Sequence, residues 1–183
     1  MLLAARRISA QEGWQSVTIR KIANEIEYSP PTIYEHFSNK EEMMHELVSE
    51  GFRQLLEKLR HAYLKADNPE SGFMSLGKAY LEFVQESKEL YEVMHGLGTI
   101  KFGTDKTPAS AKETFAFMRS VVKDLFVYKS WEEINIDDEV DIVWSSLHGL
   151  ISLSAAHRIA GDTSRFERLL HKTLANFLVL WSM

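Results

Sequence analysis

The sequence predicts an all-α protein, and two features carry that prediction. Apolar residues recur at intervals of three and four along most of the 183 residues, whereas the alternation that is typical of β-strands is scarce. The four prolines stand at positions 30, 31, 69 and 108, where each suits a helix start or a turn. We expect about nine helices, at residues 1–12, 18–26, 30–37, 40–66, 70–87, 89–97, 108–130, 137–160 and 164–182.

Composition favours a folded protein of the cytoplasm. Hydrophobic residues make up 45% of the chain, which is enough for a packed core. There is no cysteine, which excludes disulfides and thiolate metal sites and fits a reducing compartment. No apolar run approaches the roughly 18 residues of a membrane helix, so no membrane partner is expected. Because Met1 already lies in a predicted helix, we expect a few residues to precede it in the complete chain.

The second and third predicted helices are short and separated by a few residues. Ile19, Ile22 and Ile26 fall on one face of the second helix, and Ile33 and Phe37 on one face of the third. The three starts have suitable capping residues, which are Ser16 or Thr18, then Ser29, then Ser38 or Asn39 before the long fourth helix. Two short helices joined by a tight turn form a helix-turn-helix.

Turn signals divide the remainder of the chain into five further helices. They stand at Asp67-Asn68-Pro69, in the glycine-containing stretch 96–107, before the acidic start at Asp137, and at residues 161–164. We place the domain boundary inside the long fourth helix. A three-helix N-terminal domain then covers residues 1–48, and a helical ligand-binding and dimerisation domain covers residues 49–183.

Three stretches of the N-terminal domain resemble the signature of the TetR family of transcriptional regulators. They are Thr18-Ile19-Arg20-Lys21-Ile22-Ala23, Tyr28-Ser29-Pro30-Pro31-Thr32-Ile33-Tyr34-Glu35-His36-Phe37 and Asn39-Lys40-Glu41. The resemblance implies that the third helix enters the major groove of double-stranded DNA. Matched position by position, it assigns DNA contacts to Thr18, Arg20, Ser29, Pro30, Pro31, Thr32, Tyr34, His36 and Lys40.

Charge is the main argument against DNA binding. The net charge is −5, and residues 1–50 hold five basic residues against eight glutamates, which gives −3. Two glutamates depart from the family pattern. Glu27 stands where a glycine would tolerate a left-handed turn, and Glu35 would repel phosphate unless it accepted a hydrogen bond from a cytosine amine.

The C-terminal domain is rich in aromatic residues and methionine, which line ligand pockets as often as they fill cores. The stretch from Trp144 to Gly149 resembles a Trp, His-Gly pattern of one TetR subfamily. The candidate ligand-binding residues are Phe83, Tyr91, Met94, His95, Phe115, Met118, Trp144 and His148. The last two helices are expected to form a symmetric dimer interface through Leu147, Ile151, Leu170, Leu174, Phe177 and Leu178.

The resemblance implies a homodimeric repressor that a small apolar or aromatic effector releases from a pseudo-palindromic operator. The alternative is a helical interaction or sensor protein whose helix-turn-helix no longer binds DNA. An enzyme is not expected, because the chain lacks a phosphate-binding glycine loop, a His-Glu-x-x-His motif and a nucleophile elbow. No cofactor and no metal are expected, since the seven histidines show no metal-ligand spacing with a third partner.

Overall fold

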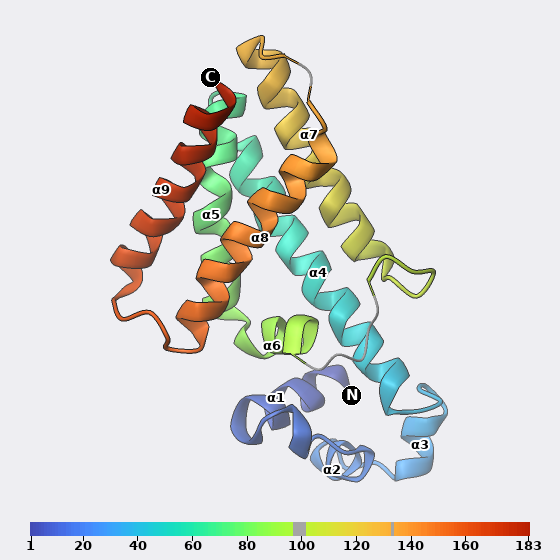
Figure 1. Ribbon diagram of the computed structural model, residues 1–183. Coiled ribbons are helices and arrows are strands. Elements are labelled where there is room, and N and C mark those ends of the chain that lie inside the picture. The colour runs from blue at the N-terminus through green and yellow to red at the C-terminus, as the bar shows by residue number, and fades with distance from the viewer. Residues whose placement is uncertain (97–101, 133) are drawn as a thin grey trace. The chain divides into compact units, whose positions relative to one another are not determined.

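The computed structural model describes residues 1–96, 102–132 and 134–183, and all regular secondary structure within them is helical (Figure 1). The helices are α1 (Leu2–Glu12), α2 (Ile19–Glu25), α3 (Pro30–Tyr34), α4 (Lys40–Leu64), α5 (Pro69–Glu86), α6 (Lys88–Gly96), α7 (Ala109–Lys129), α8 (Ile136–Ala155) and α9 (Thr163–Trp181). A 3-10 turn, Trp14–Ser16, stands between α1 and α2. The predicted all-α class with about nine helices is confirmed within these ranges.

The chain forms two compact units. The first comprises residues 1–53 and 87–112, and the second comprises residues 54–86 and 113–183. Helices α4 and α7 each contribute residues to both units. The first unit includes α6 because α1 packs against it. The predicted boundary after residue 48 stays a prediction.

Contacts of Glu89 join α1 to α6 within the first unit. Its carboxylate accepts hydrogen bonds from the Arg6 guanidinium at 2.6 and 2.9 Å, and its carbonyl accepts one at 2.8 Å from the Trp14 indole. The Arg6 and Glu89 side chains are mostly buried, so solvent screens this pair less than the pairs on the surface. The short N-terminal helices are therefore held by residues more than 70 positions away in the sequence.

Side chains cap the helices that surround the turn. Thr18 accepts a hydrogen bond from the N–H of Lys21 and so caps α2, and Asn39 accepts one from the N–H of Glu42 at the start of α4. The Glu42 carboxylate in turn accepts a bond from the N–H of Ser38, and this bond lowers the pKa of Glu42. Ser29 stands at the start of α3, but its hydroxyl bonds Thr32 instead of capping the helix.

Helices α5, α8 and α9 pack against one another in the second unit and lie side by side in Figure 1. Gly77 of α5 is the point of closest approach. A Cβ built there would lie 3.1 Å from the Cβ of Leu170 and 3.3 Å from a methyl carbon of Leu174. A glycine at this position therefore lets α5 approach α9 closely. Among the described residues, no helix is both long and apolar enough to cross a membrane.

Three helices end on a non-glycine residue in the left-handed region. Glu27 after α2, Ser130 after α7 and His157 after α8 have φ values of 58°, 55° and 54°. In each case the following N–H bonds a carbonyl five residues earlier, which is the Schellman arrangement. This arrangement ends α8 at Ala155, so the prediction that the helix continues to residue 160 is wrong.

Glu27→Gly is expected to raise the free energy of unfolding by about 1 kcal/mol. A left-handed conformation costs a non-glycine residue about 1–2 kcal/mol, and the greater backbone freedom of glycine in the unfolded chain offsets part of that gain. Urea denaturation of the two proteins at equal concentration measures the difference. Glu27→Ala is the control, because it removes the carboxylate and keeps the Cβ. An equal gain in both variants would assign the effect to charge instead of backbone strain.

Candidate functional site

The turn between α2 and α3 is fixed by backbone hydrogen bonds. The N–H of Tyr28 bonds the carbonyl of Ala23 at 2.9 Å, and the N–H of Glu27 bonds the carbonyl of Asn24 at 3.2 Å. Ile22 and Ile33 are fully buried, so both helices are held by the core of the first unit. The opposite face of α3 is thereby presented to solvent.

The predicted DNA-contacting residues lie on that exposed side. Ile33 is the one buried member of α3, and the residues around it are exposed or half-buried. Ser29 and Thr32 are brought together, with their hydroxyl oxygens 3.1 Å apart. Thr18, Arg20, Ser29, Pro30, Pro31, Tyr34 and His36 are exposed, while Thr32 and Lys40 are half-buried.

Ion pairing separates the cations of the first 50 residues into two groups. Arg6 is paired with Glu89, Arg7 with Glu25 at 3.2 Å, and Lys21 with Glu12 at 2.5 Å. Arg20 and Lys40, by contrast, make no ion pair with any residue that the structure describes. These two charges are therefore available to an external anion without first leaving a carboxylate.

Tyr28 is a candidate contact that the sequence prediction omitted. Its side chain is 59% exposed, which is as high as that of Tyr34 at 54%, and it directly precedes Ser29. Its exposure depends on the left-handed turn at Glu27, which the periodicity of α2 alone does not indicate. Glu35 is also exposed at the end of α3.

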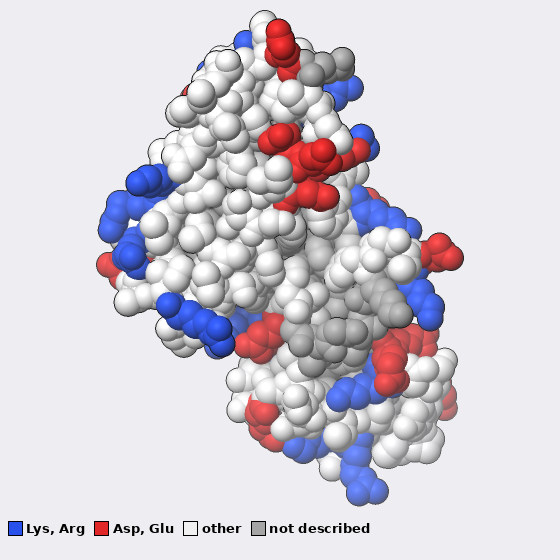
Figure 2. Space-filling view, in the orientation of Figure 1, with Lys and Arg blue, Asp and Glu red and all other residues white. Residues whose placement is uncertain are grey.

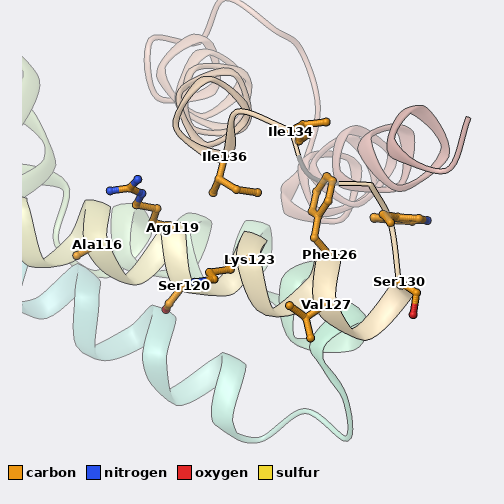
Figure 3. Close-up of a pocket in the computed structure, with 10 residues that line it drawn as sticks. Ala116, Arg119, Ser120, Lys123, Phe126, Val127, Ser130, Ile134 and Ile136 are labelled. Carbon is orange, nitrogen blue, oxygen red and sulfur yellow. The ribbon is translucent and has the colours of Figure 1, made fainter.

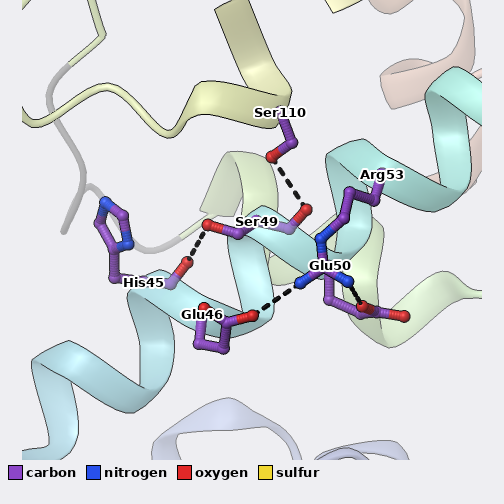
Figure 4. A network of polar contacts seen from close by, with 6 residues as sticks. All are labelled: His45, Glu46, Ser49, Glu50, Arg53 and Ser110. Atoms are coloured by element: carbon purple, nitrogen blue, oxygen red, sulfur yellow. Dashed lines mark hydrogen bonds and ion pairs between the residues drawn. The ribbon is translucent and has the colours of Figure 1, made fainter. Parts of the chain in front are cut away.

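A polar network joins α4 to the first turn of α7 within the first unit (Figure 4). The hydroxyl of Ser110 donates to the carbonyl of Ser49 at 2.9 Å. On the same stretch of α4, Arg53 pairs with Glu46 at 2.6 Å and with Glu50. This contact connects the helix that follows the helix-turn-helix to α7, which continues into the second unit.

The predicted ligand residues divide between the two units. Tyr91, Met94 and His95 belong to the first unit, where Tyr91 and Met94 are buried and the rings of Tyr91 and His95 lie 5.0 Å apart. Phe83 and Met118 are buried core residues of the second unit, with exposed fractions of 0% and 1%.

The other three predicted ligand residues, Phe115, Trp144 and His148, form one cluster around Tyr80 in the second unit. The Tyr80 hydroxyl lies 3.1 Å from Nδ1 of His148, and the Tyr80 ring stacks on Trp144 at 5.1 Å. Phe115 contacts the other side of this group, with its ring 5.5 Å from that of Trp144. Sequence spacing predicted that Trp144 and His148 share a helix face, but it did not indicate that Tyr80 joins them.

Burial lowers the pKa of His148 below its usual 6.5. The unfolded chain therefore binds a proton at a pH at which the folded chain does not. The free energy of unfolding is expected to fall as the pH drops below about 6.5, and this contribution is absent above it. Urea denaturation between pH 5 and 8 should show a smaller decline for His148→Gln than for the unchanged protein. Parallel profiles would assign the decline to other groups.

Two pockets are described in the second unit, and neither is lined by the predicted ligand residues. One, of about 550 Å³, follows α7 and the link to α8 (Figure 3). The other, of about 510 Å³, lies on α5 and α9 and is lined by Met74, Ser75, Lys78, Ser164, Glu167, Arg168 and His171. In the described ranges, no group of three His, Cys, Asp or Glu residues is placed to hold a metal ion.

Most of the predicted dimer residues are buried within the chain itself. Leu147, Ile151, Leu170 and Leu174 are at most 1% exposed, because α5, α8 and α9 enclose them. Phe177 is 8% exposed and Leu178 is half-buried. These side chains therefore support α8 and α9 from inside the unit.

The outer faces of α8 and α9 carry other apolar side chains, which are Ile142, Leu153, Val179 and Leu180. Gly149 lies in the same stretch of α8, and a Cβ built there would meet no atom within 4 Å. Figure 2 shows that the surface over α8 is largely free of charge, with acidic residues gathered at the start of this helix. An uncharged face with exposed apolar groups is suited to contact with another protein surface.

The arrangement of α2 and α3, with a buried inner face and an exposed outer face, defines the helix-turn-helix class of nucleic-acid-binding proteins. Residues 1–47 match the family described as bacterial regulatory proteins, tetR family, and residues 73–177 match the one described as Tetracyclin repressor-like, C-terminal domain. The chain belongs to the TetR family.

A curated relative is YobS of Bacillus subtilis (strain 168), an uncharacterized HTH-type transcriptional regulator. It is 27% identical over 89 residues, which are 49% of this chain and 46% of the relative. The chain thus matches about half the length of this curated relative.

Solved structures share the fold over nearly the whole chain. A protein of unknown function from Rhodococcus sp. RHA1 has a TM-score of 0.86 at 17% identity and covers 100% of this chain and 93% of its own. The TetR family transcriptional regulator PfmR from Thermus thermophilus has a TM-score of 0.70 at 17% identity, with 95% and 94% covered.

Proposed function

We propose that this chain is a homodimeric, sequence-specific DNA-binding transcriptional regulator, and more specifically a repressor that a small ligand releases from its operator. The observation that carries the proposal is the exposed face of the helix-turn-helix, where Tyr34, Arg20 and Lys40 stand around the short α3 and both cations lack a described ion-pair partner. The operator would place the protein in the cytoplasm of a bacterium, where the chromosome lies.

The unpaired cations answer the objection from net charge. Affinity for DNA depends on how many phosphates are neutralised at the interface and not on the total charge of the protein. Arg20 and Lys40 supply two such charges in each protomer, and Tyr34 and His36 supply uncharged donors. With few phosphates neutralised, the dependence of affinity on salt should be shallower than for a strongly basic binder.

Dimerisation would supply the second reading head. We assign it to the outer faces of α8 and α9, where Ile142, Leu153, Val179 and Leu180 are exposed. A two-fold axis through this face presents two copies of α3 to a pseudo-palindromic operator. Half-sites one helical turn apart, about 34 Å, or a multiple of it, would then be expected.

Release by a ligand requires that the ligand bind the DNA-free and DNA-bound states with different affinity. Helices α4 and α7 are the candidate connections, since each contributes to both units and Ser110 bonds Ser49 where they meet. The cluster of Tyr80, Trp144 and His148 is a candidate effector site in the second unit.

The test is a binding experiment with purified protein and a pool of genomic DNA fragments at two salt concentrations, in which bound fragments are sequenced. Enrichment of one short pseudo-palindrome is the expected result and gives the operator for a screen of releasing ligands. Binding that is weak, indifferent to sequence and abolished by salt would contradict the proposal. That result would favour a helical interaction or sensor protein, and sustained turnover of a substrate would favour an enzyme.

A further inference from the structure

One pocket of the second unit combines a positively charged end with an aromatic end. It has a volume of about 550 Å³, which is within the range that holds a drug-sized ligand. It follows one face of α7 and continues along the link to α8 (Figure 3). The lining residues in the first part are Ala116, Arg119, Ser120 and Lys123, and those in the second part are Phe126, Val127, Ser130, Trp131, Ile134 and Ile136.

The aromatic end is built by the way α7 terminates. Ser130 takes the left-handed conformation, and the N–H of Trp131 then bonds the carbonyl of Phe126 at 3.1 Å. This turn brings the rings of Phe126 and Trp131 to 5.3 Å in an edge-to-face contact. Trp181 of α9 lies 5.2 Å from Phe126 and donates to Glu139 of α8 at 2.7 Å. The wall is therefore held by three helices and is formed before any ligand binds.

The charged end is cationic. Arg119 and Lys123 line the pocket, and none of its described lining residues is acidic. Nε of Arg119 lies 2.5 Å from Asp137, which partly neutralises it but leaves its two terminal amino groups as donors. Lys123 makes no ion pair with a residue in the described ranges. Its neighbour Asp124 accepts a bond from the Tyr63 hydroxyl on α4.

The spacing of the two ends selects the shape of a ligand. Seven residues of helix separate Arg119 from Phe126, which is about 10 Å at 1.5 Å per residue, and Lys123 stands between them. Figure 3 shows the three side chains in this order along α7, with Ile134 and Ile136 across from them. A molecule that satisfied both ends would carry an anionic group at one end and an apolar body of several carbon atoms at the other.

We propose that this pocket binds a small organic carboxylate with an apolar or aromatic body. Lys123, assisted by Arg119, contacts the carboxylate, and Phe126, Trp131 and the two isoleucines enclose the body. The site contains none of the residues predicted for ligand binding from the sequence. The proposal names a ligand class for the second unit, and only an effect of such a ligand on DNA binding rests on the proposed function.

The experiment is isothermal titration of the whole chain, without DNA, with phenylbutyrate and with its uncharged and cationic analogues, phenylbutyramide and phenylbutylamine. Phenylbutyrate is expected to bind more tightly than both, by about tenfold, and to weaken as salt is added. Lys123→Gln should lower its affinity about five- to tenfold, whereas Lys112→Gln, a change of an exposed lysine on the same helix outside the pocket, should have no effect.

A second pair of variants tests the location without altering the cations. Val127 lines the pocket and is 72% exposed, so it accepts polar substitutions without loss of the fold. Val127→Glu places a carboxylate beside the ligand and should weaken phenylbutyrate binding several-fold more than Val127→Gln does. No saturable binding, equal affinity for the three compounds, or equal effects of the two Val127 variants would overturn the proposal. None of these results would bear on operator binding, because no DNA is present.

Discussion

Replacement of Tyr34 and Lys40 by alanine is expected to weaken operator binding about a hundredfold and leave the fold intact. Removing a single DNA-contacting side chain costs about 1–3 kcal/mol, and a dimer carries two copies of each. Tyr34 is 54% exposed and the Lys40 side chain makes no described ion pair, so the unfolding midpoint in urea should change little. Fluorescence anisotropy with the enriched operator measures the affinity.

Lys21→Ala is the matched control for Lys40→Ala. Both lysines belong to the first unit, but Lys21 already lies 2.5 Å from Glu12. Removal of a paired lysine leaves an acidic residue behind and removes little available charge, so its effect should be within about threefold. The slope of log affinity against log salt should become shallower for Lys40→Ala, by about one for each phosphate that is no longer neutralised. Equal reductions in affinity for the two single variants would contradict the argument from ion pairing.

Local signals in the sequence predicted the N-terminal fold in detail. The stripe of Ile22 and Ile33, the caps at Thr18 and Asn39, and the strained position of Glu27 all follow from residues within one or two turns of each other. The pairing of the cations was not predictable in this way. Arg6 meets a carboxylate 83 positions further along the chain, and sequence spacing contains no information about that interaction.

The C-terminal unit shows where periodicity stops being informative. A helical repeat tells which side chains share a face, as for Trp144 and His148, but not which neighbouring helix covers that face. Leu147 and Leu174 were therefore predicted for a dimer contact, although α5 covers them. The pocket on α7 was missed for a related reason, because its aromatic end is formed by a chain reversal at Ser130 that brings Trp131 back onto Phe126.

Gly149→Leu is expected to separate the dimer while the protomer stays folded. In the single chain a Cβ at this position meets no atom within 4 Å, and replacing a mid-helix glycine stabilises a helix by about 0.5–1 kcal/mol. In a dimer through the outer face of α8, the same side chain would force apart two closely packed helices. Overpacking of this kind costs about 1–3 kcal/mol for each copy, which corresponds to a rise in the dissociation constant of about tenfold or more.

Gly77→Leu provides the contrast, because that glycine faces inward. A Cβ there lies 3.1 Å from Leu170 and 3.3 Å from Leu174, so the larger side chain must push α5 away from α9 within one protomer. We expect the free energy of unfolding to fall by about 1–3 kcal/mol or more. The two glycine variants should therefore differ in kind, one losing association and the other losing stability.

Sedimentation equilibrium over a range of protein concentrations measures the first effect, and urea denaturation at fixed concentration measures the second. The concentration must be held fixed because dimerisation itself contributes to apparent stability. If Gly149→Leu remains fully dimeric, the interface lies elsewhere than the face of Ile142 and Leu153. If it becomes monomeric and also loses operator affinity, the loss follows from separating the two reading heads, since Gly149 belongs to the second unit and α3 to the first.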